Sequence, residues 1–501
     1  MIVRVLQWPL AMVMVLAFGV AMFVPALIAL RHGDYHMARS FFYGAVTFVI
    51  LINLVAAARG GSVPRDRGIY QHLREVLLVY TLMPAALAIP FQEAVQTISL
   101  SNAYFEMLSA MTTTGASTLR PAAAEVEAIL IWRGIVAWLG GGFFWVTVIY
   151  VFVPLSIGGY ELRARDEGRL HASGRQNTHR PQLADAIRSA GVFYLGVTFV
   201  VWMALLVASV PVENAVLRAM AIVSTSGIVG PSLDITQMKL VEMVSLVALL
   251  CVVTRAFLPF PVSVQKDHTA QTIYLELRLF VTVIAVLTLI SVAYHTQWAV
   301  RLGVDAPAVE FLNMVWGQIY TFASFAASFG EVSVNWNTSA DFSGQRTSYI
   351  LLIALATVGG GVATACGGVK LLRLYVLVVA FRRELEQASL PNLVPRQDLA
   401  RFSLSEAAPR AAWVFLMMFL FALAVTTVAF GYLGLGFENA MIYAVSALST
   451  TGPMIVFSQE MGADLTTASQ GVKWVYCVAM IAGRFEMLAI LTLFAPNLWR
   501  S

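Results

Sequence analysis

The stretch SAMTTTGAS, residues 109–117, is the most informative part of the sequence, because related strings recur later in the chain. Two of them are AIVSTSGIVG at 221–230 and SALSTTGPM at 446–454. Each string combines Ser/Thr residues with a glycine, directly after a short apolar segment. Another copy, IYTFASFAASFG at 319–330, aligns with IYAVSALSTTGP at 442–453. A single such string is an ordinary turn, but recurrence at near-regular spacing predicts an internal fourfold repeat.

The composition indicates a membrane protein. Of the 501 residues, 59% are hydrophobic and 12% are charged, against roughly 25% charged in soluble domains. The net charge of +4 is too small to suggest a nucleic-acid partner. The 3 cysteines lie far apart, which excludes a disulfide framework and a thiolate metal site. No histidine-ligand motif and no GxSxG elbow occur, so we expect neither an enzyme nor a cofactor.

Long apolar stretches predict an all-α polytopic protein with about ten transmembrane helices, because a spanning helix needs roughly 20 apolar residues. The predicted spans are 5–30, 40–58, 76–95, 128–157, 190–210, 240–262, 273–294, 348–381, 411–435 and 472–495. Shorter apolar pieces precede the Ser/Thr-Gly strings, at 97–111, 212–223, 308–326 and 437–448. They are too short to cross and suit re-entrant half-helices.

The distribution of Lys and Arg predicts the sidedness of the chain. Four segments hold 18 of the 32 basic residues: 59–75, 160–188, 255–278 and 382–410. Cytoplasmic segments are enriched in basic residues, so we expect these segments and the N-terminus in the cytoplasm. The half-helices then lie on the extracytoplasmic side. Segments 160–182 and 382–410 are the natural docking surface for a soluble partner.

The Ser/Thr-Gly loops are suited to an ion filter. Extended backbone at membrane depth survives only where it lines a polar cavity. Four loops around one axis would offer a ring of carbonyl oxygens that replaces the hydration shell of a monovalent cation. The half-helices would also point their negative C-terminal ends at the ion. The predicted filter residues are Thr113, Thr114, Gly115, Thr225, Ser226, Gly227, Ser328, Phe329, Gly330, Thr450, Thr451 and Gly452.

The third string departs from the pattern. Aligned without a gap, it places Phe329 where the other strings have glycine, whereas a one-residue shift places Gly330 there. A phenylalanine held at glycine's backbone angles is strained by about 1–3 kcal/mol. In either alignment one wall of the ring loses hydroxyls and gains an aromatic ring. Glu331 is expected to add a negative charge at the outer mouth.

Two further features lie within predicted spans. The stretch 348–381 exceeds one crossing and has a Gly-rich centre, which is typical of broken helices along an ion route or of close helix packing. Arg484 lies inside the last span, where a charged side chain faces a cavity or a partner. The alternative to a pore position is a buried ion pair, with Glu106, Glu331 or Glu486 as the candidates.

Together these strings resemble the Trk/Ktr/HKT superfamily of potassium transporters, most closely its bacterial Trk-type membrane subunits. The resemblance covers the whole chain and includes GGGVATACGGVKLLR (359–373) and AGRFEMLAILTLFAPNLWR (482–500). It implies a pseudo-fourfold pore, a homodimer, a cytosolic nucleotide-binding regulatory subunit and a place in the inner cell membrane. It also implies an intramembrane gate below the filter. The gate residues would be Gly359, Gly360, Gly361, Thr364, Gly367, Gly368, Lys370 and Arg484.

The resemblance implies a division of the chain into five parts. Two extra N-terminal spans occupy 1–60, and the four span–pore-helix–span repeats occupy 61–165, 166–265, 266–390 and 391–501. Each repeat holds two spans, so successive repeats share one orientation, which favours a pore over an alternating-access carrier. An intramembrane hydrolase lacks any nucleophile–base motif.

The expected function is potassium uptake, with the potassium ion as substrate. Gly115 favours potassium, because plant members of the superfamily with serine at this position are associated with sodium transport. The irregular third string leaves two alternatives open. One is a less selective sodium/potassium transporter, and the other is a poorly conducting paralogue.

Overall fold

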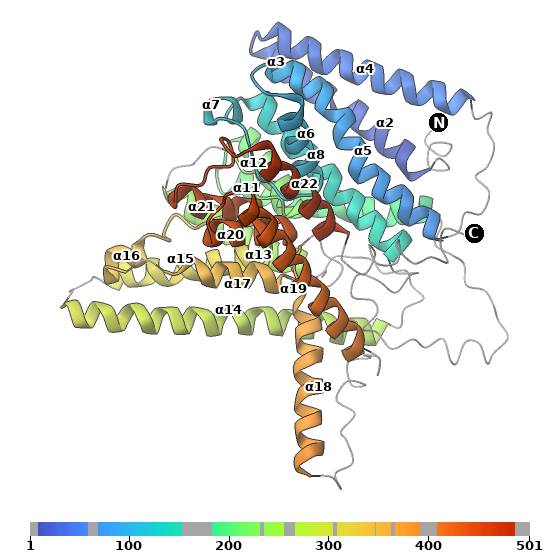
Figure 1. The fold of residues 1–501 in the computed structure, drawn as a ribbon. Helices are drawn as coiled ribbons and strands as arrows, with labels where there is room; N and C mark the ends of the chain where they lie inside the picture. Colours follow the sequence, from blue (N-terminus) through green and yellow to red (C-terminus); the bar gives the residue numbers. More distant parts are fainter. Residues whose placement is uncertain are drawn as a thin grey trace, which may run out of the picture.

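The computed structural model describes residues 9–58, 69–152, 183–230, 235–254, 266–303, 308–345, 347–361, 366–390 and 408–485. Within these ranges the chain is helical and forms no strand (Figure 1). Several predicted features fall outside them. These are segment 160–182, most of segment 382–410, Thr364 and Glu486.

Among the described residues, seven helical stretches are long and apolar enough to cross a membrane. They are Leu10–Arg31, Tyr35–Ala58, Gln71–Val95, Glu127–Phe152, Leu183–Val207, Ile273–Leu302 and Ala408–Tyr432. The prediction of an all-α polytopic membrane protein is confirmed in this form. The count of ten spans stays a prediction.

The long helices follow the predicted spans closely. Their bounds are α2 Leu10–Ala21, α3 Phe23–Arg31, α4 Tyr35–Ala58, α5 Ile69–Val95, α8 Glu127–Thr147, α11 Leu183–Val207, α13 Ile235–Val253, α14 Lys266–Leu302, α19 Ala408–Tyr432 and α22 Gln470–Arg484. A π-helical turn, Val148–Phe152, extends α8. The boundary between α2 and α3 has a local cause. Pro25 has no N–H to bond Ala21, and its ring crowds the Ala21 carbonyl.

Four short helices lie where the half-helices are predicted. They are α6 Leu100–Met111, α12 Val212–Ser224, α15 Ala308–Ala326 and α20 Phe437–Leu448. At about 1.5 Å of rise per residue, the 12 residues of α6 extend about 18 Å, well short of a bilayer core. The last two turns of α6 are fully buried, from Phe105 to Met111. These helices therefore end inside the protein.

The stretch predicted as an interrupted span consists of two helices. Helix α17, Tyr349–Val358, ends before Gly359, and α18, Leu371–Ser389, begins after Lys370. The described residues between them are not helical, and the backbone folds back on α17. Lys370 N donates to Val358 O at 2.8 Å, and Val369 N donates to Thr357 O at 2.9 Å. The interruption predicted from the glycines is confirmed.

Figure 1 shows how these elements are arranged. Helices α4 and α14 lie at opposite margins, and the short helices α12 and α20 lie between them. Helix α18 projects out of the body, and its residues from Phe381 to Ser389 are exposed. The first part of α18 is buried, with Leu371, Leu372 and Arg373 inside the protein. The interrupted segment thus connects the interior to an exposed helix.

Candidate functional site

Each short helix ends in the same way. One residue after α12 and two residues after the other three helices, a residue other than glycine adopts left-handed backbone angles, which is uncommon. The four residues have φ between 53° and 57° and are Thr113, Thr225, Ser328 and Thr450. Their N–H groups donate three residues back, and the next N–H donates five residues back, as in a Schellman motif. The latter bonds are Thr114 N to Ser109 O (2.9 Å), Ser226 N to Ala221 O (3.0 Å), Phe329 N to Ser324 O (2.9 Å) and Thr451 N to Ser446 O (2.9 Å).

This register decides between the two alignments of the third string. Gly330 follows the left-handed Ser328 at the same interval as Gly115 follows Thr113, and its φ is +77°. Gly115 and Gly227 have φ of +81° and +64°. The alignment that places Phe329 in the glycine position is therefore wrong. Phe329 has no positive φ, so the expected backbone strain does not arise.

The irregular loop is the fourth, not the third. Gly452 lacks a positive φ and starts a 3-10 turn, Gly452–Met454, that contains Pro453. Its N–H donates to the Thr114 carbonyl of the first loop at 2.7 Å. The residues STTG at 449–452 match the repeat in residue type, so the sequence pattern did not reveal that the backbone of this loop differs. The signal was Pro453, because proline restricts the residue before it.

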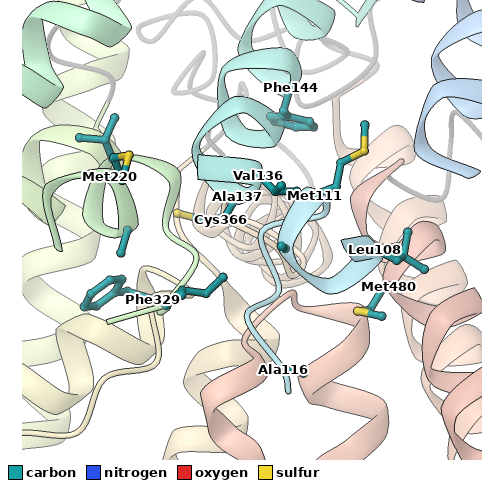
Figure 2. Packing of buried hydrophobic residues seen from close by; sticks show 14 of the residues in the cluster. Leu108, Met111, Ala116, Val136, Ala137, Phe144, Met220, Phe329, Cys366 and Met480 are labelled. Atoms are coloured by element: carbon teal, nitrogen blue, oxygen red, sulfur yellow. The ribbon is translucent and has the colours of Figure 1, made fainter. Parts of the chain in front are cut away.

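Pairs of hydroxyls lie behind three of the loops. They join the helix end to the residue after the left-handed position: Thr112 to Thr114 (2.9 Å), Ser224 to Ser226 (3.1 Å) and Ser449 to Thr451 (3.1 Å). In the third loop both partners change together, to Ala327 and Phe329. Because the backbone repeats, we infer that the Phe329 ring also points back from the loop. The ring is completely buried in the hydrophobic core (Figure 2).

Each loop touches the next in chain order, and the last touches the first. A Cβ atom on Gly115 would lie 2.0 Å from the Ser226 carbonyl oxygen, closer than any side chain could approach. The remaining contacts join Gly227 to Phe329 O, Gly330 to the Thr451 side chain and Gly452 to Thr114 O. A neighbouring backbone leaves no space for a side chain at Gly115, Gly227 and Gly452. At Gly330 the nearest atoms belong to the side chains of Thr451 and Pro453. The four loops form one closed ring.

The left-handed residues differ in what their hydroxyls bind. The Oγ1 atoms of Thr113, Thr225 and Thr450 are buried and have no hydrogen-bond partner within the described ranges. Ser328 Oγ instead accepts a hydrogen bond from Gly367 N at 3.1 Å, in the segment between α17 and α18. The third loop therefore differs from the other three in the partner of this hydroxyl.

Buried ion pairs hold the segments that follow the loops. Glu106 on α6 lies 2.9 Å from Arg133 of α8 and accepts hydrogen bonds from Thr118 after the first loop. Glu331, after the third loop, lies 2.7 Å from Arg218 of α12, and both side chains are less than 10% exposed. The expectation that Glu331 adds a free negative charge at the outer mouth is therefore wrong. Its charge is balanced by Arg218.

A third buried carboxylate anchors the same region. Glu242 on α13 accepts hydrogen bonds from Trp316 Nε1 (2.7 Å), Ser333 Oγ (3.0 Å) and Val334 N (2.8 Å). Sequence reasoning missed Arg133, Arg218 and Glu242. A signal was present, because charged residues within apolar segments are costly and usually have a defined role.

Arg484 lies at the end of α22, next to the C-terminal end of the short helix α20. It is 3% exposed, and its guanidinium carbon lies 4.0 Å from the centre of the Phe144 ring. A Cβ on the preceding Gly483 would lie 2.2 Å from Leu448 O, at the end of α20. Of its suggested ion-pair partners, Glu106 and Glu331 bind Arg133 and Arg218 instead. An ion pair of Arg484 with either of those two is therefore wrong.

Comparison with known proteins supports the family resemblance. Residues 261–501 match the family described as TrkH, cation transport protein. Over 494 residues the chain is 24% identical to the Trk system potassium uptake protein TrkH of Salmonella typhimurium and to that of Escherichia coli, and 97% of each chain is covered. It is 26% identical over 470 residues to TrkI of Halomonas elongata, covering 91% of this chain and 90% of TrkI.

The resemblance to the Trk family is confirmed. The crystal structure of the potassium transporter TrkH from Vibrio parahaemolyticus matches this chain with a TM-score of 0.77 and 20% sequence identity, and all of both chains is covered. At this level of identity the match shows a shared Trk-type fold.

One more feature of the Trk-type fold here escaped sequence reasoning. Helix α8 carries three consecutive glycines, Gly140 to Gly142. A Cβ on Gly140 would lie 2.1 Å from Met111 O, and one on Gly141 would lie 2.9 Å from Ser224 Cβ. The glycine run therefore lets α8 approach the ends of α6 and α12. Small residues allow such close backbone contact between membrane helices.

Proposed function

We propose that this chain is the membrane subunit of a potassium uptake system, and that potassium crosses the membrane through the ring of four loops. The observation that carries this proposal is the closed ring of four loops, each of which begins with the same left-handed turn. The names of the relatives, Trk system potassium uptake proteins, support potassium as the substrate.

The chemistry of the ring suits a dehydrated monovalent cation. Carbonyl oxygens and the hydroxyls of Thr113, Thr225 and Thr450 replace the water that a potassium ion loses on entry. The helices before the loops turn their negative ends toward the ring. None of the twelve filter residues is a carboxylate, the ligand type that a calcium site needs. Binding by neutral oxygens is weak enough for the ion to leave again.

The buried ion pairs keep the ring open to the ion. Glu106 and Glu331 fix the chain directly after the first and third loops. Because these carboxylates hold the chain after the loops, the loops need not reorganise when the ion binds, as in other preorganised sites. These charges therefore act through the backbone that they hold, and they do not act as ion ligands.

The segment between α17 and α18 is the proposed gate. Its described residues are Gly359, Gly360, Gly361, Gly367, Gly368 and Lys370, and it lies at the ends of the third and fourth loops. A Cβ on Gly367 would lie 2.0 Å from Ser449 O, so the segment fits closely below the ring. The Lys370 ammonium donates to Cys366 O and holds the turn together. Arg484 adds a positive charge that opposes cation passage.

The wider assembly belongs to the same proposal. Ten spans would comprise two at 1–60 and four repeats at 61–165, 166–265, 266–390 and 391–501. The protein would lie in the inner membrane among lipids, with a cytoplasmic N-terminus. It would form a homodimer and bind a cytosolic nucleotide-binding regulatory subunit. The exposed half of α18, which leads into the basic segment 382–410, supports a cytoplasmic contact there.

A second candidate is a less selective or slowly conducting sodium/potassium transporter. The observation that favours it is the fourth loop, where the Gly452 N–H occupies the Thr114 carbonyl oxygen. This bond uses one of the two lone pairs of the oxygen and makes it a weaker ion ligand. The third loop no longer supports this alternative, because its backbone follows the repeat.

The test is transport in cells that lack their own potassium uptake. We expect the chain to restore growth at limiting potassium and to carry rubidium faster than sodium. Gly115→Ala should abolish flux, because its φ of +81° is unfavourable for alanine and the new Cβ would meet Ser226 O. The matched control is Gly191→Ala on α11, which has open space around it.

Two outcomes would contradict the proposal. The first is absence of rubidium and sodium flux from chain that is inserted in the membrane, with its regulatory subunit present. The second is normal flux in Gly115→Ala. Sodium flux equal to rubidium flux would favour the less selective transporter.

A further inference from the structure

Ser328 is the exception among the four left-handed residues. The other three are threonines with hydroxyls that bond nothing within the described ranges. The Ser328 hydroxyl accepts the backbone N–H of Gly367, and the bond is fully buried. The third loop therefore differs from the other three loops in its contact with the gate segment, although its backbone angles follow the repeat.

Gly367 lies between the third and fourth loops and contacts both of them. On its other side Gly367 meets Ser449 O of the fourth loop, at a distance that leaves no space for a side chain. The segment is also anchored to α17 through Lys370 N and Val358 O. Cys366, one residue before Gly367, is 3% exposed in this arrangement.

We propose that the Ser328 hydroxyl is the latch that holds the gate segment against the third filter loop. This inference rests on the proposed function of the ring and the gate. In the closed state the latch bond satisfies the buried Gly367 N–H, which would otherwise lack a partner away from water. When the gate segment moves away, Gly367 N–H can bond to water and Ser328 Oγ becomes free.

The latch also couples the gate to the filter. With the gate closed, one of the two lone pairs of the Ser328 hydroxyl oxygen accepts the Gly367 N–H, whereas the three threonine hydroxyls have no such bond within the described ranges. Opening frees this lone pair, so the Ser328 oxygen is a stronger ion ligand in the open state. An ion that uses all four hydroxyls therefore binds the open state better and shifts the population toward it.

Cys366 supplies a readout of the latch that does not depend on flux. Replacing Cys251 and Cys477 by serine leaves Cys366 as the single thiol of the full chain. The rate of its modification by N-ethylmaleimide in membrane vesicles then reports how often the gate segment opens. We expect Ser328→Ala to raise this rate about threefold to tenfold, the effect of losing one hydrogen bond. Rubidium leak without the regulatory subunit should rise by a similar factor.

Two controls separate the bond from general loosening. Ser328→Thr keeps the hydroxyl and matches the other three loops, so it should leave the Cys366 rate unchanged. Ser324→Ala removes a buried hydroxyl from the same helix that has no partner within the described ranges, and it should also leave the rate unchanged. If Ser328→Ala does not fold, Ser328→Val against Ser328→Thr repeats the comparison at constant shape.

The outcomes for latch and transport are distinct. A Cys366 rate in Ser328→Ala equal to that of the parent chain, with intact transport, overturns the latch and leaves the proposed function in place. An equal rise in Ser324→Ala also overturns it. A raised rate specific to Ser328→Ala supports the latch even if the chain carries no ion, and in that case the transport proposal fails alone.

Discussion

The effect of Phe329 on the third loop depends on whether its side chain faces the ion path or the preceding helix. Its counterparts carry hydroxyls that bond back to the helix end, and Ala327 replaces the residue they would bond. A hydroxyl at position 327 would still donate to the carbonyl four residues back, as Thr112 Oγ1 does to Leu108 O at 2.8 Å, so Phe329 alone would remove one hydrogen bond without leaving a buried hydroxyl unpaired. With Ala327 and Phe329 both apolar, neither hydroxyl of the pair is present. Ala327 and Phe329 therefore replace a pair of hydroxyls by a pair of apolar side chains, on the side of the loop that faces its helix.

The double change Ala327→Ser with Phe329→Thr should restore the hydroxyl pair of the other loops. We expect the ratio of rubidium to sodium flux to stay within about twofold of the parent, because the new hydroxyls bond each other and do not face the ion. Flux ratios in vesicles measure this. A tenfold change in the ratio would mean that position 329 faces the pore. Phe329→Thr alone is the matched control for loss of packing.

At the scale of elements, the segment after each loop depends on a distant helix. Arg218 on α12 holds Glu331 behind the third loop, and the Tyr320 hydroxyl also donates to Glu331 at 2.5 Å. Glu242 on α13 holds the chain two and three residues further on. Burying two charges is costly, so such pairs need good geometry and additional hydrogen bonds. The third loop therefore owes its position to α12 and α13 as much as to its own helix.

Arg218→Met should destabilise the protein by roughly 3–5 kcal/mol, because Glu331 would remain buried without its partner charge. The double variant Arg218→Met with Glu331→Gln should recover much of this loss, since neither charge is then left alone. Unfolding temperatures of the detergent-purified chain give the comparison as a double-mutant cycle. A double variant less stable than Arg218→Met would contradict a direct pair. Arg301→Met on α14, an exposed arginine, is the control.

At the scale of the whole molecule, the four loops meet only because four helices end at one place. Helix α8 approaches two of those ends through its glycine run, and α22 approaches a third through Gly483. Gly367, between α17 and α18, lies next to the third and fourth ends. Figure 2 shows Met111, Met220, Phe329 and Cys366 in one buried hydrophobic cluster, although they are far apart in the sequence. The buried core and the candidate site are one structure.

The sidedness of this arrangement can be tested with two engineered cysteines. In a chain without its three native cysteines, Arg120→Cys after the first loop should react with a membrane-impermeant maleimide added to intact cells. Glu384→Cys on the exposed half of α18 should react only after the membrane is opened. Both positions are exposed, so accessibility of the side chain does not limit labelling. The reverse pattern would invert the predicted topology.

Local patterns allowed much of this protein to be predicted. The bounds of the four short helices and the break between Val358 and Leu371 follow from apolar length and glycine content, which act within a few residues. The left-handed threonines after the helices are a local motif as well. Pro453 was also a local signal that the fourth loop differs, although the residues before it match the other loops.

Short-range patterns in the sequence are sufficient to identify a helical membrane protein with four repeated Ser/Thr-Gly loops. The alignment of the third loop, the pairing of each carboxylate with its arginine and the hydroxyl that binds Gly367 N–H depend on how distant segments pack together. Backbone angles and apolar runs depend on neighbouring residues, so the sequence carries them. Contacts such as Arg218 with Glu331 and Ser328 with Gly367 join residues 113 and 39 positions apart, and no local signal specifies such a pair.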